Sequence, residues 1–508
     1  MDSFDVIVIG AGGSGLAAAC SAAEAGGKVL VLERMPQPGG TTGIAIGAFT
    51  AARTTMQQAA GIEDSVDDHA EDAGLFAPPE IEQRNNEPLR HFFLSEAAKT
   101  WEWLTSLGLS FVGPSPEPPN RVPRMHNVVP GAKAYVATLQ IALQHHGGRL
   151  ICDATVERLN RQKGRVTGVT ARVNGQLVSF AARKGVILAA GDYANNGEML
   201  ARFKGERFRE IEGINPHASG HGHELASQAG AALVNMDVTY GPELRFIPNS
   251  SQPFRQWLPT SGWKARLFGR LAQWTPKWLM RRMIKQLLVT WQHPEDSLFE
   301  DGAILINEHG HRFVNEQTWP EREIAVARQP DKIAYILLDG RLVNRYAKWP
   351  HFISTAPDIA YAYVADYLRL RADVARKAET LEAFAEALPL TELRQTIQNF
   401  NDYVEGQRKD EFGRTNDQTT LHSGPWVLLG PVKAYFTTTE GGAMIDHRMR
   451  VLNESGQTIP GLFAVGQNGL GGQILFGHGL HIAWAITSGR LAGSEVMQTE
   501  SNCEFSDS

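Results

Sequence analysis

A glycine-rich turn near the N-terminus constrains the fold more than any other part of the sequence. An apolar run at residues 4–9 leads into an alanine-rich stretch that reaches residue 25. The turn between them consists of Gly10, Ala11, Gly12, Gly13, Ser14 and Gly15. A second apolar run, residues 28–32, ends on Glu33 and Arg34. The order strand, glycine turn, helix, strand and acid is typical of a βαβ dinucleotide-binding unit. The sequence therefore predicts an α/β fold that begins with a Rossmann-type domain.

The residues of this turn have separate physical roles. Gly10 permits the tight turn, Gly12 lets backbone N–H groups approach a pyrophosphate, and Gly15 lets the helix pack on the strand. The helix directs the positive end of its dipole at the phosphates. Glu33, roughly 20 residues on, is placed to accept hydrogen bonds from a ribose diol. The alternative is an ordinary glycine-rich turn. That alternative would not explain why both strands and the acid are present at the expected spacing.

Composition excludes several classes of protein. The net charge of −6 and the isoelectric point near 6.3 give no indication of a nucleic-acid partner. The cysteines are odd in number and widely spaced, at Cys20, Cys152 and Cys503, which argues against a disulfide framework. Asp2 and Asp5 stand where a signal peptide carries positive charge, and no window of about 18 uncharged apolar residues follows. We expect a cytoplasmic protein without a membrane-spanning helix.

A second glycine-rich stretch at residues 38–47 carries a resemblance. Its sequence, PGGTTGIAIG, contains Gly40, Thr41, Thr42, Ala45 and Gly47. A pair of glycines, small polar residues and an AxG soon after the acid resemble the flavin-contacting loop of the fumarate reductase and succinate dehydrogenase flavoprotein superfamily. That superfamily also contains the 3-ketosteroid dehydrogenases. Its succinate dehydrogenase branch attaches flavin to a histidine of this loop. A threonine stands at the matching place here, so the resemblance implies FAD without a covalent bond.

Later stretches extend the resemblance over nearly the whole chain. Residues 189–195 (AAGDYAN) resemble the second FAD-contacting turn, and residues 311–316 (HRFVNE) match a motif where a capping domain approaches the flavin. Residues 437–446 and 459–467 match the closing signature, and residues 477–482 form a glycine turn that opens a helix. The resemblance implies further FAD contacts at Val156, Ala190, Gly191, Gly466, Gln467, Gly479, Leu480 and Ile482.

The domain order follows from the resemblance and from length. Single cores seldom exceed about 300 residues, so 508 residues predict more than one. We expect a Rossmann-type FAD-binding domain at residues 1–240 and 426–500. An α+β substrate-capping domain at residues 241–425 is inserted in it, and residues 501–508 form a flexible tail.

Local patterns predict elements between these motifs. Residues 67–109, 133–145 and 357–410 have helical periodicity. Residues 149–156, 165–173, 176–182 and 184–188 have the pattern of strands, with residues 174–175 as a hairpin turn.

Four residues are candidates for catalysis. Fumarate reductases use an arginine just after the RFVNE motif as proton donor, and Arg322 lies about two residues beyond that spacing. His478, in the last glycine turn, has an ordinary pKa near 6.5 and can act as acid or base, or can only hydrogen-bond the flavin. Tyr435 is a further candidate. His126 either faces the flavin or is a hydrogen-bonded structural histidine.

Two departures from the superfamily bear on the substrate. Fumarate reductases bind substrate carboxylates with an arginine before the last glycine turn and a histidine before the TxGG stretch. Phe476 and Thr437 stand there, and two carboxylates without cations cost several kcal/mol. Residues 473–476 are mainly apolar, as a pocket for a neutral ring would be.

These observations predict the activity. We expect an FAD-dependent oxidoreductase that introduces or reduces a carbon–carbon double bond next to a carbonyl in a hydrophobic, cyclic or steroid-like ketone. Hydride would pass through flavin N5, with an electron acceptor that the sequence does not name. One alternative is a reductase of unsaturated carboxylates. The other is a non-catalytic FAD-binding redox sensor.

Two features admit other ligands. His221 and His223 could bind a metal, but no third ligand stands at a recognisable spacing, so we expect none. Residues 245–291 contain nine lysines or arginines and five tryptophans, and no acid stands between Glu243 and Glu295. A solvated helical face and a nucleic-acid patch are alternatives to an amphipathic helix pair. The helix pair, lying on an anionic membrane or covering a hydrophobic pocket, uses both the charge and the aromatic rings.

Overall fold

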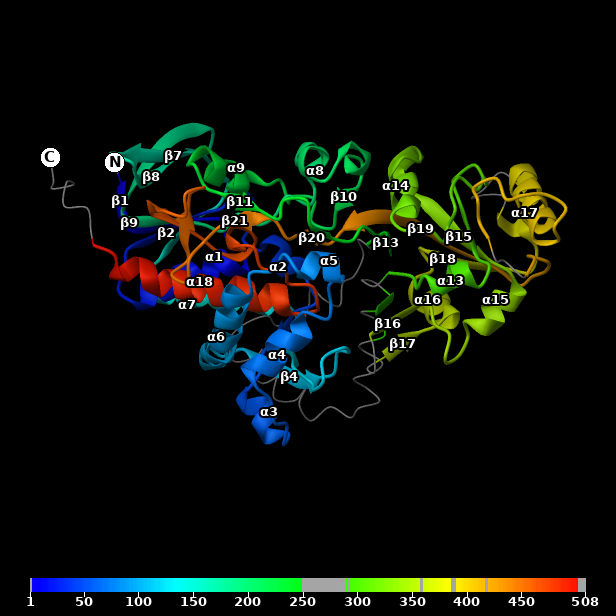
Figure 1. Ribbon diagram of the computed structural model, residues 1–508, viewed down its shortest axis with the longest axis horizontal. Coiled ribbons are helices and arrows are strands. Elements are labelled where there is room, and N and C mark those ends of the chain that lie inside the picture. The colour runs from blue at the N-terminus through cyan, green and yellow to red at the C-terminus, as the bar shows by residue number, and fades with distance from the viewer. Residues whose placement is uncertain are drawn as a thin grey trace.

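The computed structural model describes residues 2–248, 285, 288–289, 293–356, 360–384, 390–415 and 419–500. An eight-stranded sheet organises the first part of the chain, with the strand order β22-β23-β9-β1-β2-β6 (Figure 1). Off this path, β8 pairs with β9, and β7 pairs with β8. Its strands are β1 (Asp2–Ile9), β2 (Val29–Leu32), β6 (Arg149–Ile151), β7 (Ala154–Gln162), β8 (Arg165–Val173), β9 (Gln176–Leu188), β22 (Arg450–Leu452) and β23 (Thr458–Ala464). Strand β1 lies parallel to both β2 and β9. The predicted βαβ unit is therefore confirmed.

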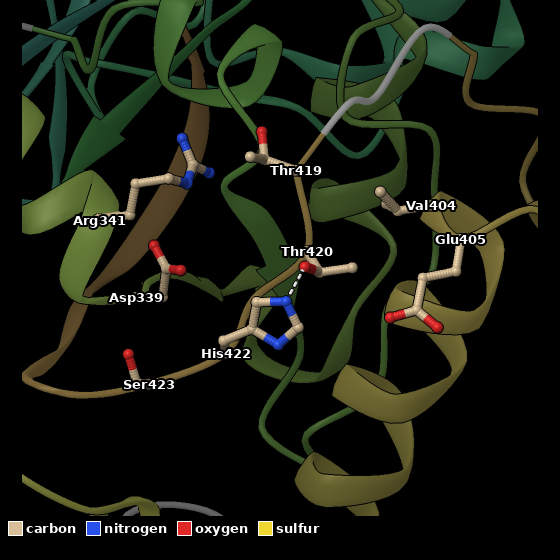
Figure 2. A pocket seen from close by; sticks show the side chains of 8 residues that line it. All are labelled: Asp339, Arg341, Val404, Glu405, Thr419, Thr420, His422 and Ser423. Carbon is tan, nitrogen blue, oxygen red and sulfur yellow. Dashed lines mark hydrogen bonds between the residues drawn. The ribbon is translucent and has the colours of Figure 1, made fainter.

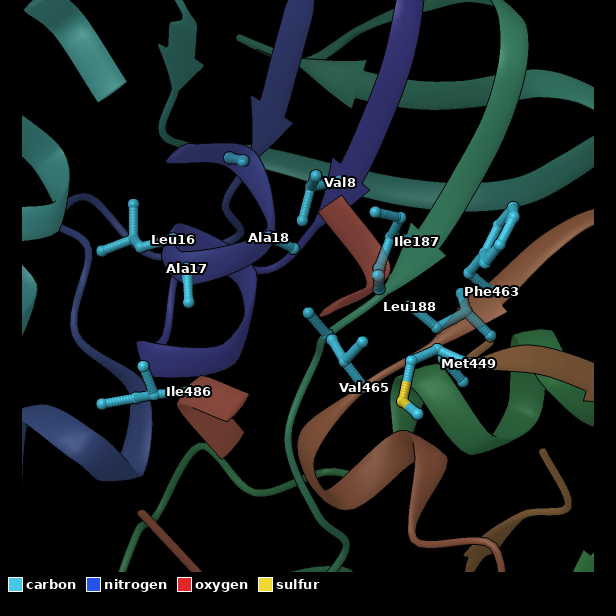
Figure 3. Packing of buried hydrophobic residues seen from close by; sticks show 14 of the residues in the cluster. Val8, Leu16, Ala17, Ala18, Ile187, Leu188, Met449, Phe463, Val465 and Ile486 are labelled. Atoms are coloured by element: carbon cyan, nitrogen blue, oxygen red, sulfur yellow. The ribbon is translucent and has the colours of Figure 1, made fainter. Parts of the chain in front are cut away.

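Two helices that cover this sheet pack closely against each other, because small residues lie where they meet. Helix α1 (Gly13–Glu24) packs against α18 (Leu480–Gln498). An added Cβ atom at Gly489 would lie 2.3 Å from the carbonyl oxygen of Ser14, and one at Gly493 would lie 2.3 Å from that of Ala18. Figure 3 shows Leu16, Ala17 and Ala18 of α1 in the core with Ile486 of α18. Side chains at those glycines would push the helices apart.

The strand predicted at residues 165–173 is confirmed with its bounds as β8, and the apolar runs at residues 4–9 and 28–32 are confirmed as β1 and β2 with slightly different bounds. Asn174 and Gly175 have φ angles of 48° and 81°, as a tight hairpin turn between β8 and β9 requires. Helix α7 (Lys133–His145) has the predicted bounds. The expected single strand at residues 149–156 is wrong, because Asp153 adopts φ 52° and separates β6 from β7. The two strands expected at residues 176–188 are one, β9.

A smaller unit lies beside the sheet. It contains α4 (Val66–Ala73), α5 (Pro79–Glu82), α6 (Glu87–Ser106) and a sheet of β3 (Ala48–Thr50), β4 (Ser110–Ser115) and β5 (Met125–Val129). The helical expectation for residues 67–109 is thus met by separate helices. Gly74 ends α4, and Pro79 lies at the first position of α5, where its missing N–H costs nothing.

The capping unit is built on a second sheet. Strand β19 (Trp426–Phe436) pairs with β10 (Glu212–Gly213), β13 (Glu243–Phe246), β15 (Ala334–Leu338) and β18 (Ala375–Ala378), and β14 (Ile304–Ile306) pairs with β15. Helices α14 (Glu321–Ala327), α15 (Gly340–Arg345), α16 (Val364–Leu370) and α17 (Leu390–Val404) lie around it (Figure 1). The helical expectation for residues 357–410 is met in part by α16 and α17, but β18 lies between them as an edge strand of this sheet.

The unit built on the first sheet and the capping unit have separate hydrophobic cores. Two short antiparallel strand pairs lie where the two units join. One core runs from Phe4 to Ala229 and from Ala443 to Val496, and the other lies between Tyr193 and Phe436. Strand β11 (Leu233–Val234) pairs with β21 (Gly442–Ala443), and β12 (Thr239–Tyr240) pairs with β20 (Thr438–Thr439). Leu233 packs against both cores, and the border at residue 240 remains a prediction. Among the helices that the structure describes, none has the length and apolar character to span a bilayer.

Candidate active site

The turn between β1 and α1 is tightly built on one side. Gly10 has a φ angle of 104°, and its N–H donates to the carbonyl of Leu32 at 2.8 Å. An added Cβ atom at Gly15 would lie 2.0 Å from the carbonyl oxygen of Gly10. Both glycines are therefore required by the backbone itself.

The other side of this turn is open, and the residues around it fit FAD. An added Cβ atom at Gly12 would meet nothing closer than Cα of Gly40 at 3.8 Å, and ones at Gly39 and Gly191 would meet nothing within 4 Å. Glu33 lies at the edge of this space, where its carboxylate accepts from the backbone N–H groups of Ala11 and Met35 at 2.7 and 2.8 Å. A pyrophosphate over Gly12 and a ribose near Glu33 would occupy that space.

The other predicted FAD residues are held in place by the protein's own contacts. Thr42 accepts from the N–H of Gly13 at 3.2 Å, and Thr41 accepts from Asn215 at 2.9 Å. Arg34 donates to Ser219 and to the carbonyl of His217. The carbonyls of Gly47 and Val156 accept from Tyr135 and His221. Gly466 lies against Ser14, and Gln467 donates to the carbonyl of Thr439. Leu480 belongs to the buried core of the first unit, against which Ala45 and Ile482 also pack.

The last glycine turn begins α18. Gly477 and Gly479 have φ angles of 111° and 88°, and Gly479 is the N-cap residue in the left-handed region. Between them, the carbonyl of His478 accepts from Thr50 at 2.7 Å. An added Cβ atom at Gly479 would lie 2.6 Å from the hydroxyl oxygen of Thr50. The turn is thus pressed against β3, which fixes the backbone of His478.

His478 forms an ion pair with Glu117. Nδ1 and the backbone nitrogen of His478 each lie 2.6 Å from Oε1 of Glu117. The Glu117 side chain is only 6% exposed, whereas that of His478 is 50% exposed. Partial burial lowers the pKa of His478, but the hydrogen bond and negative charge of Glu117 raise that pKa further, to a net value above 6.5. The pair with Glu117 therefore favours the protonated imidazole.

An aromatic pair stands next to this histidine. The rings of Tyr240, on β12, and Phe476 lie 5.0 Å apart and meet edge to face at 74°. Burial, and then the charge of Glu243, raises the pKa of Tyr240 well above its usual value. Phe476 packs with Ala77, Val238 and Ile474 in a small apolar cluster. This wall is apolar, with one phenol hydroxyl that stays protonated.

Strand β13 brings an unexpected cation to the same place. Arg245 donates to Glu243 at 2.8 Å and to the hydroxyl of Thr437 at 3.3 Å. Nδ1 of His293 lies 3.9 Å from Glu243. The inference that no cation stands near Thr437 is therefore wrong, because an arginine from another strand reaches it. Glu243 compensates the charge of that arginine.

Arg322 lies in the capping unit with carboxylates around it. It donates to Glu323 at 2.9 and 2.6 Å, to Asp296 at 2.7 Å and to the carbonyl of Glu316 at 3.1 Å. Burial lowers its pKa, but the charges of Glu323 and Asp296 raise it above the usual value. Within the described part of the chain, no hydrogen bond or ion pair joins Arg322 to His478. Its role as proton donor remains a prediction.

His126 lies on β5, where it pairs with Phe49 of β3, and Tyr435 lies on β19. Fully buried, His126 donates from Nδ1 to the carbonyl of Phe49 and accepts at Nε2 from Thr54. Burial lowers the pKa of His126 to about 4. This placement favours the structural alternative, in which His126 stays neutral. Tyr435, on β19, has a pKa raised to about 12 by burial and by Glu212, its neighbour on β10.

Several residues at this site were missed in the sequence. Glu117, Tyr240, Glu243 and Arg245 belong to no motif, and His481 was passed over within the glycine turn. His481, in the first turn of α18, donates to the buried carboxylate of Glu440 at 2.6 Å. The sequence signal for these contacts is the pair of histidines, His478 and His481, on either side of Gly479. Their carboxylate partners, Glu117 and Glu440, come from distant segments.

Two other predicted or visible features lie outside this site. His221 donates to a backbone carbonyl of β7, and His223 to that of Gly441. Across the part of the chain that the structure describes, no three histidines, cysteines or carboxylates are grouped to hold a metal. Figure 2 shows a pocket between α15 and α17, at the end of the capping unit far from α18 in Figure 1. It is lined by Asp339, Arg341, Val404, Glu405, Thr419, Thr420, His422 and Ser423, and includes no predicted site residue.

Comparison with known proteins agrees with this geometry. A family model described as "FAD binding domain" matches residues 5–255 and 267–473. Fumarate reductase (cytochrome) of Shewanella frigidimarina is 28% identical over 503 residues, which cover 97% of this chain and 77% of the relative. Vinyl phenol reductase of Lactiplantibacillus plantarum is 26% identical over 519 residues, which cover 98% of this chain and 97% of the relative.

A solved structure shares the fold. The 3-ketosteroid delta1-dehydrogenase of Sterolibacterium denitrificans, in complex with 1,4-androstadiene-3,17-dione, matches with a TM-score of 0.64 and 19% identity. The match covers 98% of this chain and 100% of that one, which confirms the predicted fold class. Because the family model covers most of the sequence, the chain belongs to the FAD binding domain family and is an FAD-dependent oxidoreductase.

Proposed function

We propose that the chain acts on a carbon–carbon bond next to a carbonyl in a hydrophobic, cyclic or steroid-like ketone, which it either reduces or desaturates. The observation that carries this proposal is the ion pair of His478 and Glu117 beside the aromatic pair of Tyr240 and Phe476. Bound FAD would supply hydride exchange through its N5 atom.

His478 is suited to handle the proton. Because Nδ1 donates to Glu117, Nε2 is the nitrogen left to face a substrate. In reduction, the imidazolium gives its Nε2 proton to the α-carbon of the substrate. In desaturation, the neutral ring takes that proton as a base. Glu117 acts as a positioning residue, since it fixes the ring and stabilises its charge.

The charges of the site favour a neutral substrate over a dicarboxylate. Arg245 is compensated by Glu243, and His478 by Glu117. A dicarboxylate would have to compete with both resident carboxylates for these cations. The apolar wall of Phe476 and Tyr240 offers a neutral ring a surface to pack on. A relative named vinyl phenol reductase supports this preference for a ring-bearing substrate.

A reductase of unsaturated carboxylates is the second candidate, and Arg245 favours it. Its guanidinium reaches Thr437, and it would need only to exchange Glu243 for a substrate carboxylate. The similarity to a fumarate reductase points the same way. The two candidates differ in substrate charge and share the roles of FAD and His478.

A redox screen separates the candidates. The flavin is photoreduced without oxygen and mixed with a cyclic enone, a vinyl phenol or fumarate, and the oxidised enzyme is mixed with the saturated cyclic ketone. The proposal predicts a change of flavin redox state with the ketone pair. A response to the vinyl phenol alone would contradict the requirement for a carbonyl next to the reacting bond. A response to fumarate alone favours the second candidate. No response to any of them, with flavin bound, favours a redox sensor.

We propose that the cofactor is bound without a covalent bond. Thr41 and Thr42 lie in the short helix α2 (Gly40–Ile44), next to the space that would hold FAD, and their hydroxyls take part in hydrogen bonds with Asn215 and Gly13. Acid precipitation of the holoprotein should release all yellow colour into the supernatant. Flavin that stays in the pellet would contradict this.

The basic segment at residues 245–291 lies mostly outside the described residues. Its described end belongs to the capping unit, where Lys285 pairs with Asp366 at 3.0 Å and Leu288 and Val289 are buried. For the remaining residues of this segment we propose a contact with an anionic membrane or a cover over a hydrophobic substrate pocket. Flotation with anionic and with neutral liposomes tests the lipid contact. The whole chain is compared with a variant that carries Trp274→Glu and Trp278→Glu. Equal flotation of the two proteins would exclude it.

A further inference from the structure

Asn468 joins the turn that follows β9 to the start of helix α9 (His221–Gln228). Its Oδ1 accepts from the N–H of Ala190 at 2.6 Å, and its Nδ2 donates to the carbonyl of Gly191 at 2.8 Å. Nδ2 also lies 3.3 Å from Nδ1 of His223. Asn468 is 1% exposed. One buried amide therefore satisfies two neighbouring backbone groups of the turn that follows β9.

The chemistry of the partners fixes the orientation of this amide. A backbone N–H can only donate and a backbone carbonyl can only accept, so the oxygen of Asn468 must face Ala190 and its nitrogen must face Gly191. The reverse orientation would place donor against donor and acceptor against acceptor. Asn468 thus has one allowed orientation.

His223 continues the same hydrogen-bond polarity. Its Nε2 donates to the carbonyl of Gly441 at 2.9 Å, so in the neutral ring Nδ1 is the acceptor that faces Asn468. A proton on Nδ1 would oppose the amide N–H. Burial lowers the pKa of His223 to about 4, which agrees with a neutral ring.

The fit around Asn468 is close. An added Cβ atom at Gly222 would lie 2.2 Å from Oδ1 of Asn468. His223 packs edge to face against Tyr193 at 5.0 Å, and Tyr193 donates to the carbonyl of Met236. The amide therefore has little freedom to move to other partners.

We infer that Asn468 is a positioning residue for FAD that sets the backbone of Ala190 and Gly191 at the edge of the cofactor space. Gly191 has a φ angle of 79° and faces open space. The chain of hydrogen bonds passes through His223 to Gly441, next to Glu440, which holds His481 at the start of α18. Asn468 thereby links the turn after β9 to the turn that begins α18.

Variants of Asn468 test this inference through cofactor binding. Asn468→Asp keeps the acceptor for Ala190 but places an oxygen against the carbonyl of Gly191 and Nδ1 of His223. Asn468→Ala removes both bonds. We expect the Kd of the deflavinated protein for FAD to rise about 10-fold or more in each, because buried polar groups lose their partners. Fluorescence titration measures that Kd, and circular dichroism with urea unfolding measures the folded fraction and stability.

Asn453→Asp is the matched control. Asn453 lies in the turn between β22 and β23, where its Oδ1 accepts from Ser455 and Gln457, and an aspartate can make both bonds. We expect wild-type FAD affinity for this variant. Wild-type affinity of folded Asn468→Asp and Asn468→Ala would overturn the inference, even if both variants were less stable. That result would leave Asn468 a structural residue only. Neither readout depends on which substrate the enzyme uses.

Discussion

Oε1 of Glu117 lies 2.6 Å from both Nδ1 and the backbone nitrogen of His478, although 361 residues separate the two in sequence. A single carboxylate oxygen thereby fixes the ring and the peptide of the last glycine turn. The other ring nitrogen, Nε2, lies outside this pair. The pair couples the protonation of His478 to the buried charge of Glu117.

The first prediction concerns this coupling. Glu117→Gln keeps a hydrogen-bond acceptor but removes the negative charge that raises the pKa of His478. If His478 is the acid in reduction, the rate falls as pH rises through its pKa, and that fall should move to lower pH in the variant. We expect reduction near neutral pH to slow by about 10-fold to 100-fold. The control is Glu102→Gln, an exposed glutamate on α6. An unchanged pH profile for Glu117→Gln would contradict the role of the pair.

The second prediction concerns acid stability. The pKa of buried His126 is about 4 in the fold and about 6.5 when unfolded, so the unfolded state binds the proton first as pH falls. Stability is therefore lost between pH 6.5 and 4, with about 2 kcal/mol lost by pH 5 from this group. His126→Gln should reduce the difference between the free energies of unfolding at pH 7 and pH 5. Urea unfolding at both values measures it, with exposed His91→Gln as control. The same pH difference in His126→Gln and wild type would refute the assignment.

The third prediction separates two glycines of one turn. Gly15→Ala places a Cβ atom 2.0 Å from the carbonyl oxygen of Gly10, so it should destabilise the fold with or without FAD. Gly12→Val adds a side chain to open space, so the deflavinated protein should unfold as wild type does. FAD binding by Gly12→Val should be lost, because the side chain would occupy the place of the pyrophosphate. Urea unfolding and FAD titration distinguish the two. Tight FAD binding by Gly12→Val would show that the cofactor lies elsewhere.

The fourth prediction concerns substrate charge. Glu243→Gln removes the carboxylate that compensates Arg245, so a substrate carboxylate can take its place. We expect kcat/KM for an unsaturated monocarboxylate to rise about 10-fold relative to that for a neutral enone. Glu198→Gln on α8 (Gly197–Phe203), which neutralises a glutamate in an exposed arginine pair, is the control. An unchanged preference would mean that Arg245 does not meet the substrate.

The elements that the sequence predicted correctly are those whose conformation depends on residues close by in the chain. The turn from Gly10 to Gly15, the hairpin at Asn174 and Gly175, and helix α7 depend on backbone conformation and periodicity within a short stretch. The break at Asp153 was missed because a non-glycine residue with positive φ leaves little trace in composition. Strand β18 was missed because its pairing with β19 bridges about fifty residues.

The candidate site was predicted unevenly for the same reason. His478 stands in a recognisable glycine turn, whereas Glu117, its partner, comes from the loop between β4 and β5 and has no motif. The threonine at position 437 suggested a site without a cation, yet antiparallel pairing of β13 with β19 places Arg245 beside it. Such contacts depend on strand register between distant segments, which a single sequence does not reveal.

The most direct measurement of the central claim is the rate at which reduced flavin is reoxidised in a single turnover. Photoreduced wild type and His478→Gln are each mixed without oxygen with a cyclic enone and, separately, with fumarate. We predict fast reoxidation of wild type by the enone, slow reoxidation by fumarate, and a rate with the enone about 100-fold lower in His478→Gln. Reoxidation by fumarate as fast as by the enone, or an enone rate unchanged in His478→Gln, would contradict the account.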